Sequence, residues 1–356
     1  MQSILSTNYY VHFEESAYIN LGEYLKENFF SKIFLFVDSN TRTHCLPLFL
    51  ERADFQEKVE ILEVEAGEIH KNINTCNLLW NRLSDLGADR KSIIINLGGG
   101  VITDMGGFVA STFKRGLKFI NVPTTLLSMV DASVGGKTGV DLGALKNQIG
   151  LFSNPEMVLI DMDFLKTVSD REMKSGLAEI IKYGFTFDKA LWQTIKNFKG
   201  LDMDIIKKLV HRSVEIKNDV VLQDLLENSL RKSLNFGHTI GHAIESYFLE
   251  SPDKKSLTHG EAIAAGMVIE LYYSSIKFDF PLTHTNELKS FVNDFYGKIP
   301  IEEHDLPEII DLMKYDKKNV SGLVNFVLLD ALEHCQLDIQ LSTTAIREGF
   351  DFYMKN

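Results

Sequence analysis

The chain of 356 residues has a formal net charge of −12, with 45% hydrophobic and 24% charged residues. Its length suits two domains better than one core, and its composition is that of a globular protein. The acidic balance argues against a nucleic-acid-binding protein, whose surface would be basic. Basic residues can still gather locally around an anionic small molecule.

The sequence shows no pattern typical of disulfide-linked, secreted or membrane-spanning proteins. The three cysteines, Cys45, Cys76 and Cys335, are scattered and form no CxxC pair, so neither a disulfide framework nor a cysteine-rich zinc site is indicated. The first residues lack the pattern of a secretory signal peptide, and no apolar run approaches the ~20 residues of a membrane span. We expect a soluble cytoplasmic protein without a membrane partner.

The first part of the chain alternates strand-like and helix-like segments. Apolar runs predict strands within 32–40, 92–100, 118–125 and 157–161, and an alternating pattern predicts one within 60–68. Between the second and third, Leu79, Leu83 and Leu86 have helical spacing and Gly87 is a plausible helix end. We therefore predict an α/β domain over residues 1–165, with a mostly parallel, Rossmann-like sheet and helices on both faces.

The pattern changes after about residue 165. Long helix-patterned stretches follow, such as "DREMKSGLAEIIKYG" and "HGEAIAAGMVIELYYSSI", with few β-branched runs between them. They predict a mostly α-helical domain over residues 166–356. A ligand is expected between two such domains.

Two glycine-rich stretches could bind phosphate. In "INLGGGVITDMGGF" (95–108), three glycines directly follow a predicted strand and precede a predicted helix, which suits either a pyrophosphate loop or a tight turn. "SVGGKTG" (133–139) is not a P-loop, because the template needs glycine where Asp131 stands. It leaves a turn that presents Lys137 near Asp131, either to a phosphate or nicotinamide or simply to solvent.

The stretch "LNFGHTIGHAIE" (234–245) places His238, His242 and Glu245 on one face of a predicted helix. By itself this pattern suits a metal site lacking one ligand, a pair of catalytic histidines, or a polar stripe.

Several blocks together resemble the 3-dehydroquinate synthases of the sugar-phosphate cyclase superfamily. They run in order from "GGGVITDMGGFVASTFKRG" through "VPTTLLSMVDASVGGKTGVD", "LKNQIG", "GLAEIIKYG", "LRKSLNFGHTIGHAIE" and "HGEAIAAGM" to "DKK", and the resemblance spans roughly residues 66 to 318. It implies an NAD-binding α/β domain, a helical metal-binding domain with one divalent metal (Zn²⁺, with Co²⁺ as an alternative), and a homodimer. The implied activity converts the sugar-acid phosphate 3-deoxy-D-arabino-heptulosonate 7-phosphate (DAHP) into 3-dehydroquinate and phosphate, a step of the shikimate pathway.

The resemblance also implies roles for individual residues. Glu179, His238 and His259 match the metal ligands, a set that suits Zn²⁺. His242 would move a proton on the substrate, and Glu245 would be helix surface or a neighbour of the ligands. The remaining substrate and catalytic positions are Asp131, Lys137, Asn147, Lys182, Lys217, Glu227, Arg231, Asn235, Lys317 (or Lys318), and Arg115 reaching in from a partner subunit.

The predicted cofactor positions lie in the first domain, except Thr167 just beyond its boundary. The resemblance implies Glu68, Lys71, Gly99, Gly100, Val101, Asp104, Thr124, Thr125, Lys137, Lys146 and Thr167. Asp38 is added because it directly follows the first predicted strand, where it could contact the adenosine side. Without the resemblance, Lys182, Lys217 and Arg231 would be expected as solvated surface charges.

The chain departs from the family pattern in places. Thr103 stands where the family usually has glycine, and "DLLENSLR" (224–231) differs from the family's "DExExGLR". Three alternatives to this activity remain open. The chain could be another sugar-phosphate cyclase, a metal-dependent polyol dehydrogenase or a non-catalytic nucleotide-binding protein. The last of these would be expected to lack the metal ligands.

Overall fold

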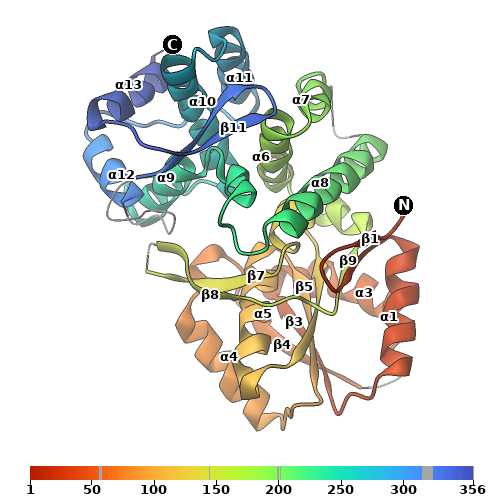
Figure 1. Ribbon diagram of the computed structural model, residues 1–356. Coiled ribbons are helices and arrows are strands. Elements are labelled where there is room, and N and C mark those ends of the chain that lie inside the picture. Colours follow the sequence, from red (N-terminus) through yellow and green to blue (C-terminus); the bar gives the residue numbers. More distant parts are fainter. Residues whose placement is uncertain (56–57, 144, 199, 201, 315–323, 356) are drawn as a thin grey trace. The chain divides into compact units, whose positions relative to one another are not determined.

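The computed structural model describes residues 1–356 except 56–57, 144, 199, 201, 315–323 and 356. The chain divides into two compact units (Figure 1), the first made of Met1–Met173 with Val210–Leu222 and the second of Lys174–Leu209 with Gln223–Asn356. Helix α8 (Met203–Gln223) contributes to both units. No sequence signal marks the return of Val210–Leu222 to the first unit.

The first unit is built on a seven-stranded sheet in the order β1-β2-β9-β6-β5-β3-β4. The strands are β1 (Ile4–Leu5), β2 (Tyr10–Phe13), β3 (Ile33–Asp38), β4 (Val59–Val64), β5 (Ile93–Gly98), β6 (Lys118–Pro123) and β9 (Met157–Ile160). Strand β1 pairs antiparallel with β2, and the other neighbouring pairs are parallel. The predicted mostly parallel sheet is confirmed, whereas the short strands β1 and β2 were not predicted.

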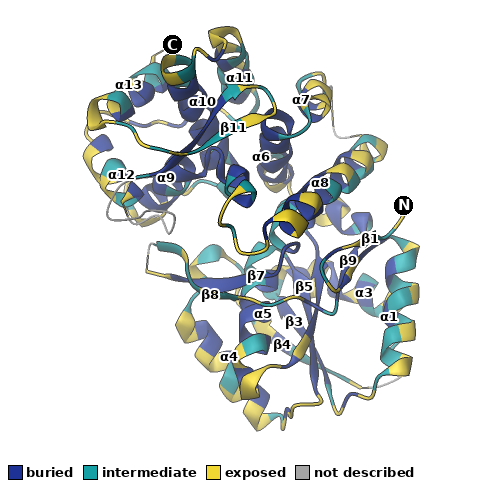
Figure 2. Ribbon diagram, in the orientation of Figure 1, coloured by how far each residue is buried: buried dark blue, intermediate teal, exposed yellow. Residues whose placement is uncertain are grey.

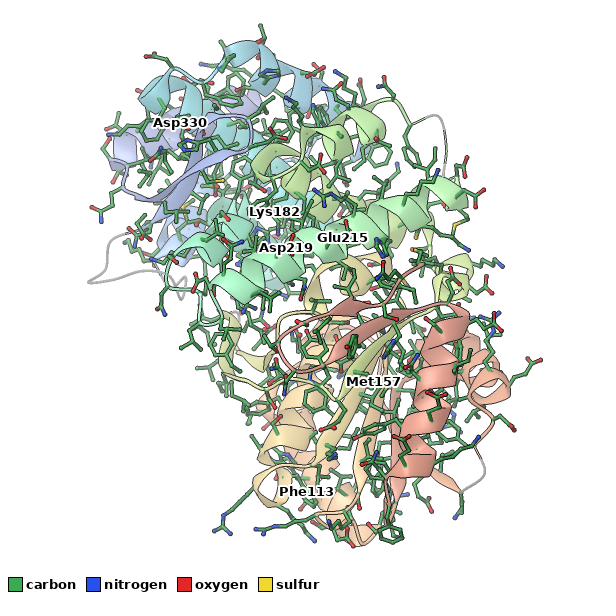
Figure 3. All side chains as sticks on the ribbon, turned by 45° about the vertical axis from the view of Figure 1, so that its right-hand side comes forward. Phe113, Met157, Lys182, Glu215, Asp219 and Asp330 are labelled. Atoms are coloured by element: carbon green, nitrogen blue, oxygen red, sulfur yellow. The ribbon has the colours of Figure 1, made fainter. Side chains whose placement is uncertain are left out.

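Helices cover both faces of this sheet (Figure 1). They are α1 (Glu15–Glu27), α2 (Ser39–His44), α3 (Leu46–Ala53), α4 (Ile73–Asp85) and α5 (Gly100–Thr112). Leu79 and Leu83 of α4 are buried in one core with Phe34, Ile94 and Ile102 from the sheet and α5. Figure 2 shows the central strands β3, β5, β6 and β9 mostly buried, and Figure 3 labels Met157 at the start of β9. Burial on both faces explains why β3 and β5 are mostly apolar, with the buried Asn96 interrupting the run of β5.

A two-stranded hairpin of β7 (Lys137–Leu142) and β8 (Leu145–Phe152) lies beside α5. A Cβ atom on Gly150 would lie 2.3 Å from the carbonyl oxygen of Thr138, so only glycine permits this close pairing. The prediction of a turn over 133–139 was therefore wrong at its end, because β7 already begins at Lys137.

The second unit is mostly helical. Its helices are α6 (Asp170–Thr186, whose first turn belongs to the first unit), α7 (Lys189–Lys196), the start of α8, α9 (His238–Glu250), α10 (His259–Phe278), α11 (Leu282–Phe295), α12 (Leu306–Met313) and α13 (Thr343–Met354). Strands β10 (Phe326–Ala331) and β11 (His334–Ile339) add a hairpin that escaped prediction. Helix α10 is buried along most of its length (Figure 2), as its nearly continuous apolar sequence requires. Within the described residues, no helix combines the length and apolarity needed to cross a membrane.

Candidate active site

Three helices of the second unit bring together Glu179, His238 and His259, the predicted metal ligands. Glu179 lies within α6, while His238 and His259 are the first residues of α9 and α10. The Oε1 atom of Glu179 lies 3.4 Å from Nε2 of each histidine. The carboxylate is fully buried, so residues far apart in sequence form one compact cluster.

The distances in this cluster fit a metal ion. A direct N–H···O hydrogen bond is about 2.7–3.2 Å long, and Glu179 Oε1 has no hydrogen-bond partner although it is buried. Metal–ligand bonds of about 2.0–2.2 Å in tetrahedral geometry separate the ligand atoms by about 3.4 Å. The orphaned carboxylate oxygen and the two imidazole nitrogens are therefore spaced as the ligands of one divalent cation.

Both imidazole rings are held through their other nitrogen. Nδ1 of His238 lies 3.0 Å from the carbonyl oxygen of Phe236, and Nδ1 of His259 lies 3.1 Å from Oε2 of Glu245. Both partners accept hydrogen bonds, so each Nδ1 carries the proton and each Nε2 faces Glu179. Glu245 is buried, which rules out the helix-surface alternative for this residue.

The electrostatics of the cluster distinguish the two histidines. Burial lowers the pKa of His238 below its usual value despite the neighbouring Glu179. For His259 burial also acts to lower the pKa, but Glu245 and Glu179 outweigh it and raise the pKa to about 10. Burial opposes ionisation of Glu179 too, yet Lys182 and His238 hold its pKa well below its usual value. The carboxylate is thus ionised, as a metal ligand must be.

His242 lies one helical turn after His238 and close to the same point. One ring nitrogen from each of His238, His242 and His259 can be chosen so that all lie within 4.8 Å of one another. The ring centres of His242 and His259 are 5.7 Å apart. Two ligand sets are therefore possible, one with Glu179 and one with His242 as the third ligand.

Close helix packing fixes the position of His238. A Cβ atom on Gly266 of α10 would lie 2.1 Å from the carbonyl oxygen of Gly237 and 2.8 Å from the amide nitrogen of Gly241. Glu270, fully buried in α10, accepts a 2.6 Å hydrogen bond from the amide of Gly237. This carboxylate caps the start of α9 and complements its dipole. Sequence analysis missed Glu270, whose only signal is that it is a charged residue in the otherwise apolar middle of α10.

The connection between α9 and α10, residues 251–258, is anchored to Asp305. This buried carboxylate accepts hydrogen bonds from the Tyr247 hydroxyl at 2.6 Å and from the Lys254 ammonium at 2.8 Å. At the end of the connection, Thr258 and Glu261 form a capping box. The first turn of α10, which begins with His259, is thereby held at its N-terminus.

Several predicted substrate residues of the second unit are buried. Lys182, labelled in Figure 3, forms an ion pair with Oε2 of Glu179. Arg231 donates to the carbonyl oxygen of Leu225 at 2.8 Å, and Asn235 donates to Glu227 at 2.8 Å. Lys182 and Arg231 are each only 1% exposed. The alternative of solvated surface charges is therefore wrong for both.

Asp224 organises the segment 224–231, where the sequence departs from the family pattern. Its carboxylate accepts hydrogen bonds from the amides of Asn228, Ser229 and Arg231 at 2.7 to 3.0 Å. Asp224, which the family pattern also has, therefore fixes the backbone conformation of the segment that ends at Arg231. The predicted Lys317 and its alternative Lys318 lie outside the described residues.

In the first unit, predicted cofactor and substrate residues form a charged network. Lys71, which is buried, donates to Asp104 at 2.6 Å and to Asn147 at 2.7 Å. Lys146 donates to Glu68 at 2.8 Å. Asp141 links the two groups, since it accepts from the Asn147 amide at 2.7 Å and lies 3.7 Å from Lys146. Asp141, which sequence analysis missed, has its pKa raised to about 6 by burial, despite Lys71 and Lys146.

The glycine-rich turn forms the start of α5. Gly99 is the N-cap of this helix and has no side-chain cap, and Gly100 and Val101 begin the first turn. Amide groups at such a helix start can bind a pyrophosphate. A Cβ atom on Gly98 would lie 2.5 Å from that of Ile102. The close contact at Gly98 explains a glycine in a tight turn, and the pyrophosphate site at the start of α5 stays a prediction.

Thr103 is buried, and its hydroxyl donates to the carbonyl oxygens of Gly99 and Gly100 at 3.3 Å. This hydroxyl serves the backbone of its own helix. We therefore expect Thr103→Val to change the dissociation constant for the NAD that the family resemblance implies by less than about twofold, because the hydrogen bonds lost are long and replaceable by packing. Quenching of protein fluorescence by NAD measures the constant. A tenfold weakening would contradict this and show that the hydroxyl binds the dinucleotide.

The other predicted residues of this unit have partners of their own or differ in exposure. Asp131, in the π-helical turn Ser128–Ala132, accepts from Lys217 of α8 at 2.7 Å. Lys217 is buried, so the solvated alternative is wrong for it as well. Asp38 caps α2 through the amide of Thr41. Of the remaining positions, Lys137 and Thr125 are half-buried, Thr124 is buried, and Thr167 and Arg115 are exposed.

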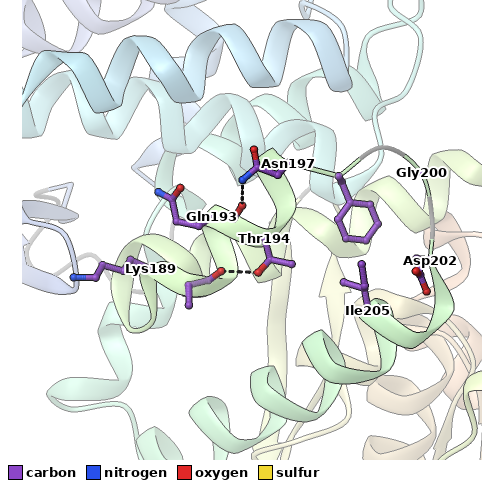
Figure 4. Close-up of a pocket in the computed structure, with 9 residues that line it drawn as sticks. Lys189, Gln193, Thr194, Asn197, Gly200, Asp202 and Ile205 are labelled. Carbon is purple, nitrogen blue, oxygen red and sulfur yellow. Dashed lines mark hydrogen bonds between the residues drawn. The ribbon is translucent and has the colours of Figure 1, made fainter.

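A surface hollow of about 1140 Å³ lies beside α7 and the start of α8 (Figure 4). Its lining includes Lys189, Gln193, Asn197 and Asp202. Thr194 and Asn197 donate to carbonyl oxygens of α7 itself. The hollow contains no predicted site residue and gives no indication of a ligand.

Comparison with known proteins identifies the family. The model of the 3-dehydroquinate synthase N-terminal domain matches residues 61–175, and that of the C-terminal domain matches residues 176–319. The chain belongs to the 3-dehydroquinate synthase family. A 3-dehydroquinate synthase of Parabacteroides distasonis is 39% identical over 94% of this chain and 95% of its own. One of Clostridium beijerinckii is 40% identical over 84% and 85%, respectively.

Solved structures support the fold. A 2-deoxy-scyllo-inosose synthase, complexed with carbaglucose-6-phosphate, NAD⁺ and Co²⁺, superimposes with a TM-score of 0.83 at 24% identity, covering 98% of both chains. The 2-epi-5-epi-valiolone synthase of Streptomyces hygroscopicus, with NAD⁺ and Zn²⁺ bound, gives 0.83 at 21% identity over 99% of this chain and 98% of its own. A glycerol dehydrogenase of Schizosaccharomyces pombe gives 0.65 at 17% identity over 98% and 89%.

Proposed function

We propose that this chain converts DAHP into 3-dehydroquinate and phosphate through a transient oxidation by NAD, elimination of phosphate, reduction, and an intramolecular aldol closure. The reaction makes it a carbon–oxygen lyase. The observation that carries the proposal is the cluster of Glu179, His238 and His259, whose orphaned carboxylate oxygen is spaced for a metal in a chain of this family.

We assign the metal to the second unit. Glu179, His238 and His259 would hold one divalent cation, Zn²⁺ or alternatively Co²⁺, which supplies Lewis-acid polarisation of a substrate hydroxyl and lowers its pKa. Glu179 stays ionised beside Lys182 and is therefore ready to serve as a ligand. The Co²⁺ and Zn²⁺ in the solved relatives support a metal here.

We assign the dinucleotide to the first unit, where NAD, when bound, supplies reversible hydride acceptance. The amide groups at the start of α5 would bind its pyrophosphate. The Lys71–Asp104 and Lys146–Glu68 pairs place fixed charges in the same unit. The NAD⁺ in the solved relatives supports this assignment.

The remaining residues would bind and orient the substrate. Arg231 offers a planar fork for an oxyanion, and lysines such as Lys182 act as compact charges. A ring nitrogen of His242 would hold or release a proton close to the metal ligands. We further propose that the protein is a cytoplasmic homodimer. Arg115 is exposed and has a backbone φ of 71°. Its side chain would reach the substrate phosphate bound by the partner subunit.

The test is to incubate the metal-loaded protein with DAHP and NAD⁺. We expect phosphate and 3-dehydroquinate to appear in equal amounts without net formation of NADH, because the hydride returns to the intermediate. Omission of NAD⁺ from stripped protein and addition of a chelator are the controls. Absence of turnover, or turnover only with a seven-carbon phosphate lacking the carboxylate, would refute the proposal. Net NADH formation would instead indicate a dehydrogenase.

A further inference from the structure

We infer that Glu245 is a positioning residue that orients His259 for metal binding. The inference rests on the proposed metal site and extends it to a carboxylate that is not itself a ligand. Glu245 lies on α9 and His259 begins α10, so the contact joins the two helices that supply the histidine ligands.

The contact is direct, and its carboxylate is largely shielded from water. Oε2 of Glu245 lies 3.1 Å from Nδ1 of His259, and the Glu245 side chain is 9% exposed. Because a carboxylate accepts hydrogen bonds and does not donate them, the Nδ1 proton is fixed on the side facing Glu245. Nε2 then faces Glu179, 3.4 Å from its Oε1 atom. Rotation of the ring would break both contacts together.

The second histidine provides an internal comparison. Nδ1 of His238 is held at 3.0 Å by the carbonyl oxygen of Phe236, an uncharged acceptor from its own chain segment. The charged acceptor Glu245 makes His259 a stronger electron donor, and it comes from another helix. Nδ1 of His238 is thus held by the local backbone, whereas Nδ1 of His259 is held by a side chain from another helix.

Burial of Glu245 has a cost that the contact with His259 offsets. Neighbouring residues Ala243, Ile244 and Phe248 of α9 are also buried. A carboxylate among such residues is unfavourable unless it is hydrogen-bonded and paired. An apolar side chain would suit packing alone, whereas the carboxylate of Glu245 pairs with the imidazole of His259.

The experiment is a titration of the metal-free protein with Co²⁺, followed by visible absorption. Carboxylate partners of ligand histidines typically account for 10–100-fold in metal affinity. We expect Glu245→Gln to raise the Co²⁺ dissociation constant about tenfold and Glu245→Leu to raise it about a hundredfold. Each variant should also have an altered absorption spectrum. Glu245→Asp should recover part of the affinity lost in Glu245→Leu. Glu250→Gln, at the exposed end of the same helix, is the matched control and should bind as the wild type does.

Thermal unfolding of the metal-free variants separates positioning from packing. An unchanged Co²⁺ constant and spectrum in Glu245→Gln and Glu245→Leu would overturn the inference, even if their melting temperatures fall. No Co²⁺ binding by the wild type would also overturn it. Because the titration contains no substrate, a wild type that binds Co²⁺ but makes no 3-dehydroquinate refutes the proposed function and leaves this inference standing.

Discussion

His259→Ala is expected to abolish both metal retention and turnover of DAHP. The change removes one of the two imidazole nitrogens that lie 3.4 Å from Glu179 Oε1 and leaves that buried carboxylate without one of its facing groups. Mutation of a residue that only hydrogen-bonds to a metal ligand typically lowers metal affinity about 10–100-fold. Loss of the ligand His259 itself should lower it further. Atomic absorption after dialysis measures the metal content, and phosphate release measures turnover.

The matched variant is His242→Ala on the same cluster. We expect it to keep the metal and lose turnover, because its proposed role is to move a proton on the substrate. Equal loss of metal in both variants would contradict this division. It would favour the alternative set in which His238, His242 and His259 are the three ligands.

Gly266→Ala is expected to destabilise the second unit by about 3 kcal/mol. The new methyl group would lie 2.1 Å from the carbonyl oxygen of Gly237 and 2.8 Å from the amide nitrogen of Gly241. Both are backbone atoms of the α9 region, so relief requires the two helices to separate. Urea unfolding, followed by circular dichroism, measures the change in the free energy of unfolding.

Gly22→Ala is the control for this variant. Gly22 lies in α1, where an added Cβ atom has no heavy atom within 4 Å. Alanine there should stabilise the protein by up to about 1 kcal/mol through its higher helix propensity. If Gly266→Ala unfolds at the wild-type urea concentration, the close approach of α9 and α10 is not a constraint on the fold.

The parallel sheet could be predicted because its central strands carry a strong signal. β3 and β5 are buried on both faces, and their sequences are mostly apolar and are followed by turn residues. β1 and β2 could not be predicted, since two and four residues give too little periodicity. The same holds for β10 and β11, whose pairing is a tertiary property.

The candidate site was only partly visible in the sequence. Glu179 and His259 are separated by many residues, so the family resemblance was needed to place them with His238. The burial of Lys182 and Lys217 could not be foreseen, because a buried and a solvated helical lysine have the same spacing. Glu245 did carry a signal, since it follows His242 by three residues on the same helix face.

The anchoring of residues 251–258 to Asp305 limits how this segment can change in length. Lys254 is fixed in its middle by the 2.8 Å contact with Asp305, and Thr258 is fixed at its end by the capping box. Added residues at exposed Pro252 and Asp253, or at Lys255 and Ser256, can loop outward. An insertion between Thr258 and His259 would instead rotate α10 relative to its cap. Relatives of different length in this segment are therefore expected to differ before Thr258.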